Sequence, residues 1–211
     1  MPTVDLIRSC LRATRLTPLV VGGVLSTCIM VVPVLLGVEL DAIDATLALH
    51  LAMFALLMGA AFVLDDAAYP STEVLPISAA TTAVIRMGLA LVPVSIFWAI
   101  ALWLAPKTMV STAEYARAGL VVEAYGCLVW VWAVVMFTAR RRGGIGSAVA
   151  APFLLIATAT AVLLPDSLAV FVSPGAPGYA ESRPRWAVVL GVGLAVLAVA
   201  TRRPGRAPAS A

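Results

Sequence analysis

Long apolar runs restrict what this chain can fold into more than any other feature. Residues 16–40 carry no charge before Glu39, and five further segments approach or exceed the ~20 apolar residues that cross a bilayer. Of the 211 residues, 62% are hydrophobic and 12% are charged. A soluble domain of this size does not need so much apolar surface, so the composition predicts an integral membrane protein.

The apolar runs predict an all-α membrane protein with six transmembrane helices in one domain, residues 16–201. A short amphipathic helix, residues 1–15, is expected before this domain, and a cytoplasmic tail, residues 202–211, after it. The expected spans cover about residues 16–40, 45–64, 87–105, 118–139, 145–164 and 186–201.

The pattern within residues 1–15 is typical of a helix that lies in the membrane interface. Its basic face would sit near anionic headgroups, although a plain topology anchor explains the same arginines equally well. The apolar face is formed by Val4, Ile7 and Leu11, and the basic face by Arg8, Arg12 and Arg15.

The basic residues predict which side each connection faces, because positively charged connections stay in the cytoplasm. Both termini and the connection 65–86 are therefore expected to be cytoplasmic, and the connection 165–185 external. The cytoplasmic set has ten members: Arg8, Arg12, Arg15, Arg86, Arg140, Arg141, Arg142, Arg202, Arg203 and Arg206. The external set has four: Lys107, Arg117, Arg183 and Arg185.

The connection 65–86, DDAAYPSTEVLPISAATTAVIR, is the longest polar interruption that does not look like an outward-facing loop. It contains three acids, Asp65, Asp66 and Glu73, and it closes with Arg86. Acids at the C-terminal end of a helix oppose the helix dipole, so Asp65 and Asp66 do not stabilise the preceding span. This favours a contact role for them over a solvated helix terminus.

Residue counts exclude several kinds of chemistry. The only lysine, Lys107, follows a proline and lacks the glycine-rich loop of a nucleotide site. The only histidine, His50, cannot form a zinc-protease pair or a Cys/His metal cluster. No second acidic cluster accompanies Asp65 and Asp66 to hold magnesium. The net charge of +3 comes from short basic groups beside membrane segments and indicates no nucleic-acid binding. We therefore expect no catalytic residue, metal or cofactor in this chain.

His50 and Glu123 form a candidate polar pair inside the membrane. Each lies about five residues from the outer end of its expected span, which places both about 8 Å deep. Equal depth allows a hydrogen bond between the two helices, and ionisable groups at such depth are functional candidates. They either line an outer cavity or simply reach the interface.

The stretch FALLMGAAFVLDDAAYPSTEVLPISAATTAVIRMGLAL resembles the second span, first cytoplasmic loop and third span of small six-span permeases of actinobacterial ABC exporters. Across about residues 62–89, a span ends in Asp65-Asp66, a Leu75-Pro76 step follows, and Arg86 opens the next span. Loops of that family often carry several arginines after Leu-Pro, whereas residues 77–82 carry none.

The resemblance implies a permease subunit in a bacterial cytoplasmic membrane that exports a small molecule, peptide or lipid, with antibiotic resistance as one use. Its loop 65–86 would dock on a separate ATPase subunit that holds ATP and magnesium. A second permease copy or a homologous half-permease would complete the path, and short external helices would lie between the last two spans. The coupling residues implied are Asp65, Asp66, Glu73, Leu75, Pro76 and Arg86.

Two other classes of protein fit the sequence. An accessory, immunity or scaffold membrane protein would need no ATPase and would show no effect of ATP. A membrane-embedded enzyme or independent transporter would act alone and would need His50, Glu123, Asp65 or Asp66.

Overall fold

The computed structural model of the protein describes residues 14–65, 79–109, 117–141, 145–165, 169–172 and 178–201. Six α-helices and three short 3₁₀ turns account for most of these residues, and no strand occurs among them. The helices are α2 (Thr17–Leu36), α3 (Ala42–Ala61), α5 (Ala79–Leu104), α6 (Arg117–Arg141), α7 (Ala150–Val162) and α8 (Tyr179–Thr201). The 3₁₀ turns are η1 (Phe62–Leu64), η2 (Ala105–Lys107) and η3 (Ser147–Val149).

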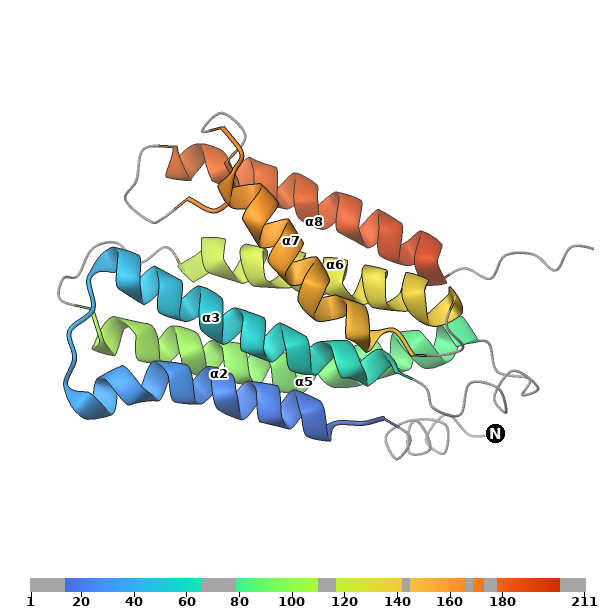
Figure 1. Ribbon diagram of the computed structural model, residues 1–211, viewed down its shortest axis with the longest axis horizontal. Coiled ribbons are helices and arrows are strands. Elements are labelled where there is room, and N and C mark those ends of the chain that lie inside the picture. The colour runs from blue at the N-terminus through green and yellow to red at the C-terminus, as the bar shows by residue number, and fades with distance from the viewer. Residues whose placement is uncertain are drawn as a thin grey trace, which may run out of the picture.

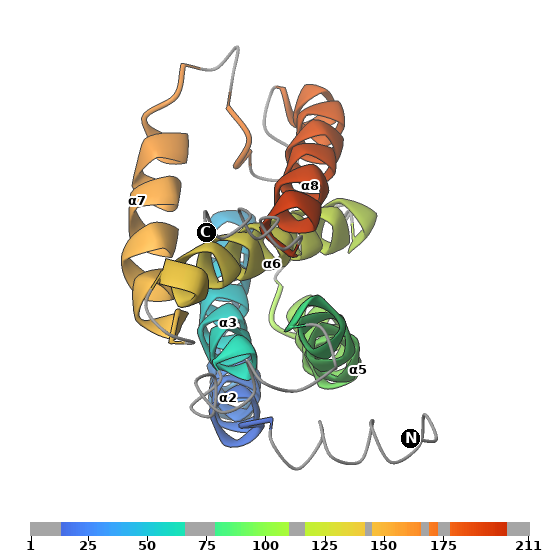
Figure 2. The ribbon, with the colours of Figure 1, turned by 90° about the vertical axis from the view of Figure 1, so that its right-hand side faces the viewer.

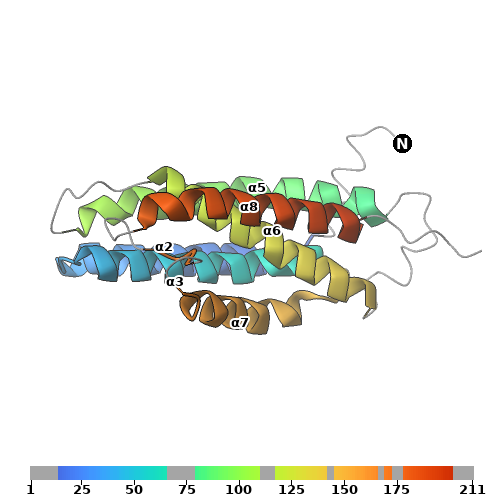
Figure 3. The ribbon, with the colours of Figure 1, turned by 90° about the horizontal axis from the view of Figure 1, so that it is seen from above.

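Consecutive helices run in opposite directions along one common axis (Figure 1). α3 and α6 finish, and α5 and α7 begin, at the same end of the bundle, which is called the Asp65 end below. Seen along the axis, α2, α3 and α5 are clustered and α6 crosses them (Figure 2). α7 and α8 lie apart from each other, as the view from above also shows (Figure 3).

Local sequence signals set the ends of the first two helices. Gly37 ends α2 in the left-handed region, with φ of 63°, where glycine has no Cβ to clash. The Asp41 carboxylate begins α3 by accepting hydrogen bonds from the backbone N–H groups of Ile43 and Asp44 at 2.8 and 2.7 Å. The turn between these helices is held to the end of α5, since Leu40 donates its N–H to the Thr108 carbonyl at 2.7 Å.

Among the residues that the structure describes, five helices are long and apolar enough to cross a membrane, whereas six spans were predicted. The predicted fifth span, 145–164, contains α7 with only 13 residues. At about 1.5 Å per residue α7 is about 20 Å long, less than the ~30 Å hydrocarbon core. The α-helix begins only at Ala150 because residues 147–149 form the tighter turn η3.

The observed helix boundaries differ most from the predicted ones at the starts of α5 and α8, where polar residues had been assigned to connections. α5 begins at Ala79, so the last eight residues of the expected loop 65–86 are helical. They contain no glycine or proline, and alanine is the best helix former, which explains why the helix extends this far. α8 begins at Tyr179, ahead of the expected 186, with Glu181 in its first turn where an acid suits the dipole.

Large apolar side chains remain exposed on the outer faces of the helices. Examples are Leu35 on α2 at 77%, Val92 on α5 at 62%, and Leu155 on α7 at 73%. A soluble protein rarely exposes so much contiguous apolar surface, whereas lipid is a matching solvent for it. The exposed faces therefore agree with the apolar lengths of the helices.

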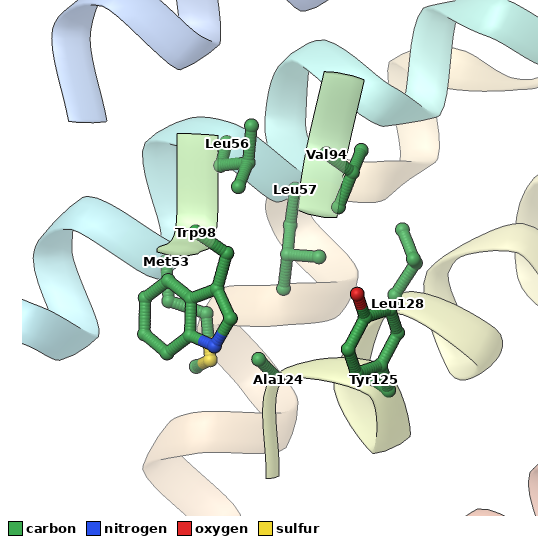
Figure 4. A pocket seen from close by; sticks show the side chains of 8 residues that line it. All are labelled: Met53, Leu56, Leu57, Val94, Trp98, Ala124, Tyr125 and Leu128. Atoms are coloured by element: carbon green, nitrogen blue, oxygen red, sulfur yellow. The ribbon is translucent and has the colours of Figure 1, made fainter. Parts of the chain in front are cut away.

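The helices α3, α5 and α6 pack closely where they meet. Their shared interior leaves a space of only about 10 Å³, no more than one water molecule needs. Leu56, Val94, Trp98 and Tyr125 are among the side chains that surround it (Figure 4). The Tyr125 hydroxyl is satisfied there by the Ser95 hydroxyl at 2.6 Å.

Two glycines allow the close contact between α2 and α3. A Cβ added to Gly22 would lie 2.5 Å from the Ala55 carbonyl oxygen, and one added to Gly59 would lie 2.5 Å from that of Pro18. Both obstacles are backbone atoms, which cannot turn aside as a side chain can. Small residues on both helices are the usual means of such close approach in membranes.

We expect Gly59→Ala to lower the midpoint of thermal unfolding in detergent, because forced overpacking costs about 1–3 kcal/mol. Gly88→Ala in α5 is the matched control, since nothing lies within 4 Å of a Cβ at that position. There, alanine should leave stability unchanged or raise it by up to about 1 kcal/mol. Equal unfolding midpoints for the two variants would contradict the contact.

Candidate functional site

The carboxylate of Asp65 lies between the end of η1 and the start of η3, at the end of the bundle where α3 and α6 finish. Its Oδ1 accepts hydrogen bonds from the backbone N–H groups of Gly146 at 2.8 Å and Ser147 at 2.9 Å. Its Oδ2 accepts a hydrogen bond from the Ser147 hydroxyl at 2.5 Å. A residue that follows α3 therefore satisfies the N–H groups at the start of η3, and η3 leads directly into α7.

The segment that receives Asp65 is itself pressed against α6. A Cβ on Gly146 would lie 2.2 Å from the Val135 carbonyl oxygen, so only glycine fits at this point of contact. Asp65 is 8% exposed and Ser147 is 4% exposed. The hydrogen bonds between them are therefore shielded from water, which makes their loss more costly.

Arg86 connects a third helix to the same place. It lies in the second turn of α5, is 4% exposed, and its Nη1 donates to the backbone carbonyl of Asp65 at 3.4 Å. Asp65 thus contacts both the start of α7, through its side chain, and the start of α5, through its carbonyl. We call the group formed by Asp65, Arg86, Gly146 and Ser147 the Asp65 cluster.

The Asp65 cluster changes how the predicted coupling residues are interpreted. Asp65 and Arg86 were expected to contact a partner, but both side chains lie inside the protein and the Asp65 carboxylate is bound to α7. Asp65 directly precedes residues 66–78, and Arg86 lies in the second turn of α5, the helix that follows them. The remaining predicted coupling residues, Asp66, Glu73, Leu75 and Pro76, belong to 66–78, outside the described residues, and their roles stay predictions.

His50 and Glu123, the candidate polar pair, form a hydrogen bond between α3 and α6. His50 Nε2 lies 2.6 Å from Glu123 Oε1. The Glu123 side chain is 3% exposed and that of His50 is 21% exposed. Since α3 begins at Ala42, His50 lies about 12 Å along its helix, deeper than the sequence suggested. Within an apolar region such a pair can bind a polar group or share a proton.

A short segment of the chain covers this pair. The Phe171 ring meets the His50 ring edge-on at a centroid distance of 5.3 Å and the Trp186 ring at 5.1 Å. The segment is held by its carbonyl groups, because Trp186 Nε1 donates to Val170 at 2.8 Å and Arg185 Nη1 donates to Ala169 at 2.6 Å. We call residues 169–172 the cover segment.

The sequence indicated an apolar segment at this place in the chain but not which residues the segment contacts. Its apolar residues stand out within a Pro/Gly-rich connection, 165–185, which was interpreted as external and in which short external helices were expected. The described part, 169–172, has no helical assignment. Nothing in the local pattern identifies His50, 121 positions earlier, as the ring that Phe171 contacts. The structure brings them together because α3, α6 and α8 are adjacent.

Arg183 adds a basic group at the same end of α6. Its guanidinium stacks over the Tyr179 ring at 4.0 Å. It also lies so close to Gly119, one turn before Glu123, that any side chain at that position would displace it. The polar groups near the start of α6 and α8 are thus packed together.

No group of three or more His, Cys, Asp or Glu side chains that could hold a metal ion occurs within the described ranges. Comparison of the sequence with protein-family models and with curated proteins, and of the fold with solved structures, finds no match. The resemblance of residues 62–89 to exporter permeases accordingly remains a hypothesis.

We expect Asp65→Ala to destabilise the protein by about 3 kcal/mol or more, because it leaves three buried donors without an acceptor. Asp41→Ala is the matched control, since it removes an exposed aspartate that also caps a helix. Loss of that cap should cost about 1 kcal/mol. Unfolding by heat or denaturant in the same micelle measures both losses, and similar values would show that the Asp65 cluster is not buried as described.

We expect His50 and Glu123 to be energetically coupled. Glu123→Ala or His50→Ala alone leaves a buried polar partner unsatisfied, so the double variant should lose less stability than the sum of the single losses. The coupling energy for such contacts is about 0.5–3 kcal/mol. A double-mutant cycle of unfolding free energies measures it, and strictly additive losses would contradict the hydrogen bond.

Proposed function

We propose that this chain is the permease subunit of an exporter whose energy comes from a separate ATPase subunit. The observation that carries the proposal is the Asp65 cluster, which connects both flanks of residues 66–78 to α5 and α7. A force applied to residues 66–78 would reach these helices through Asp65 and Arg86. This is the property that a coupling segment needs.

The packing of α7 supports a moving role for this helix. α7 is short, its outer residues Leu155 and Ile156 are 73% and 67% exposed, and its helix neighbours are α6 and α3. Its contribution to the buried core is small, with Ala150 and Leu154 from its first two turns. When one element must shift against a rigid group, the least-packed element costs the least to move.

The need for a partner follows from the sequence. Its only lysine lacks the glycine-rich context of a phosphate-binding loop, so ATP and magnesium belong on another chain. Few ionisable groups lie inside the helices, so an ion gradient has little to act on. We further propose a second copy or a homologous half-permease beside this chain in the bacterial cytoplasmic membrane, because one bundle is small for enclosing a path. The cargo would be a small molecule, peptide or lipid.

We expect this chain to co-purify in mild detergent with the ATPase encoded beside it. Replacement of residues 71–78 by a Gly/Ser sequence of equal length should abolish the complex. Asp65→Asn should keep the complex, because the side chain is buried, but should weaken the effect of the permease on ATP hydrolysis. A pull-down measures formation of the complex, and the rate of ATP hydrolysis measures the effect of the permease on the ATPase.

The matched control is a Gly/Ser replacement of residues 110–116, which connect α5 and α6 at the opposite end of the bundle. This variant should retain both the complex and the ATPase effect. Absence of any complex with the wild-type chain would overturn the exporter proposal and favour an accessory protein or an embedded enzyme. Equal dependence on 110–116 would overturn the assignment of the coupling segment.

A further inference from the structure

A cavity of about 290 Å³ lies beside α7, between this helix and parts of α3, α6 and α8. α7 contributes the small side chains of Ala157, Thr158 and Ala161 to its wall, and α3, α6, α8 and the cover segment provide the other walls. Phe153 and Leu154 close the part of the cavity nearer the start of α7, and the three small residues leave space farther along the helix. The cavity is about twice as large as an apolar cavity that holds benzene.

The chemistry of the walls selects an apolar occupant. Two indole N–H groups border the cavity, but both are already used: Trp130 Nε1 donates to the Val189 carbonyl at 3.0 Å and Trp186 Nε1 donates to the Val170 carbonyl at 2.8 Å. The remaining lining is almost entirely aliphatic and aromatic. Water makes few hydrogen bonds in such a space, whereas hydrocarbon fits it.

One wall of the cavity also contacts the polar pair. Phe171 lines the cavity and meets the His50 ring edge-on, while His50 is hydrogen-bonded to Glu123. Phe171 therefore lies between the cavity and the polar pair and contacts both. The outer faces of α7 and α8 expose large apolar residues, such as Leu155 and Val188, so a hydrocarbon chain reaches the cavity directly from lipid.

We propose that this cavity binds the hydrocarbon chain of an amphipathic molecule that enters from the membrane, with Phe171 between that chain and the pair of His50 and Glu123. The inference rests on the proposed function, in which that molecule is the exported substrate. α7 is then both the wall of the binding site and the helix that the Asp65 cluster connects to residues 66–78. Movement of α7 changes the volume available to the chain.

The test uses tryptophan fluorescence of the purified full chain in nanodiscs of unbrominated phosphatidylcholine. Dibromostearic acid is the probe, because bromine quenches a nearby indole and Trp130 and Trp186 border the cavity. We expect quenching that saturates with the mole fraction of probe and that unbrominated stearic acid reverses. Ala157→Phe, which fills the cavity, should remove the saturable part.

The matched control is Leu155→Phe, which adds bulk on the lipid-facing side of α7 and should leave saturable quenching unchanged. Ala161→Leu provides a second filled variant, and unfolding midpoints identify any variant that is not folded. Quenching that rises in proportion to probe without saturating, or that is the same in the filled variants, would overturn the site and indicate contact with bulk lipid. No ATPase is present, so this result is independent of the co-purification.

Discussion

The buried carboxylate of Asp65 is the interaction on which the arrangement at one end of the protein depends. A charged group away from water is stable only when its oxygens are well supplied with donors, and here Gly146 and Ser147 provide three. Those donors are also the unpaired groups at the start of η3, which leads into α7. The same hydrogen bonds therefore lower two free-energy costs. One is the cost of burying the Asp65 carboxylate, and the other is the cost of leaving the N–H groups at the start of η3 without an acceptor.

This connection joins two parts of the molecule that pack very differently. The interior between α3, α5 and α6 leaves about 10 Å³ empty, while the space beside α7 measures about 290 Å³. Backbone-to-backbone contact at Gly22 and Gly59 makes the α2–α3 pair rigid. α7 has no comparable contact with α8, so its position depends on α6, α3 and the Asp65 cluster.

The sequence predicted the all-helical class and identified His50 and Glu123 as a candidate pair, because apolar length and the position of a lone polar residue are local properties. It did not predict that α7 would be shorter than the hydrocarbon core. The apolar composition of residues 145–164 does not indicate that a 3₁₀ turn occupies residues 147–149 and that the α-helix begins only after it. It also interpreted Asp65 as an exposed contact, because nothing near Asp65 in the chain indicates Gly146 and Ser147, about 80 positions later.

The sequence by itself determined a helical chain with long apolar segments, since bilayer thickness sets segment length and backbone groups in lipid must be satisfied within the helix. Only the tertiary structure decided which donors meet Asp65, that Phe171 covers His50, and that a cavity remains beside α7. These features depend on residues from separate helices, and their pairing follows from how the helices pack rather than from any pattern along the chain.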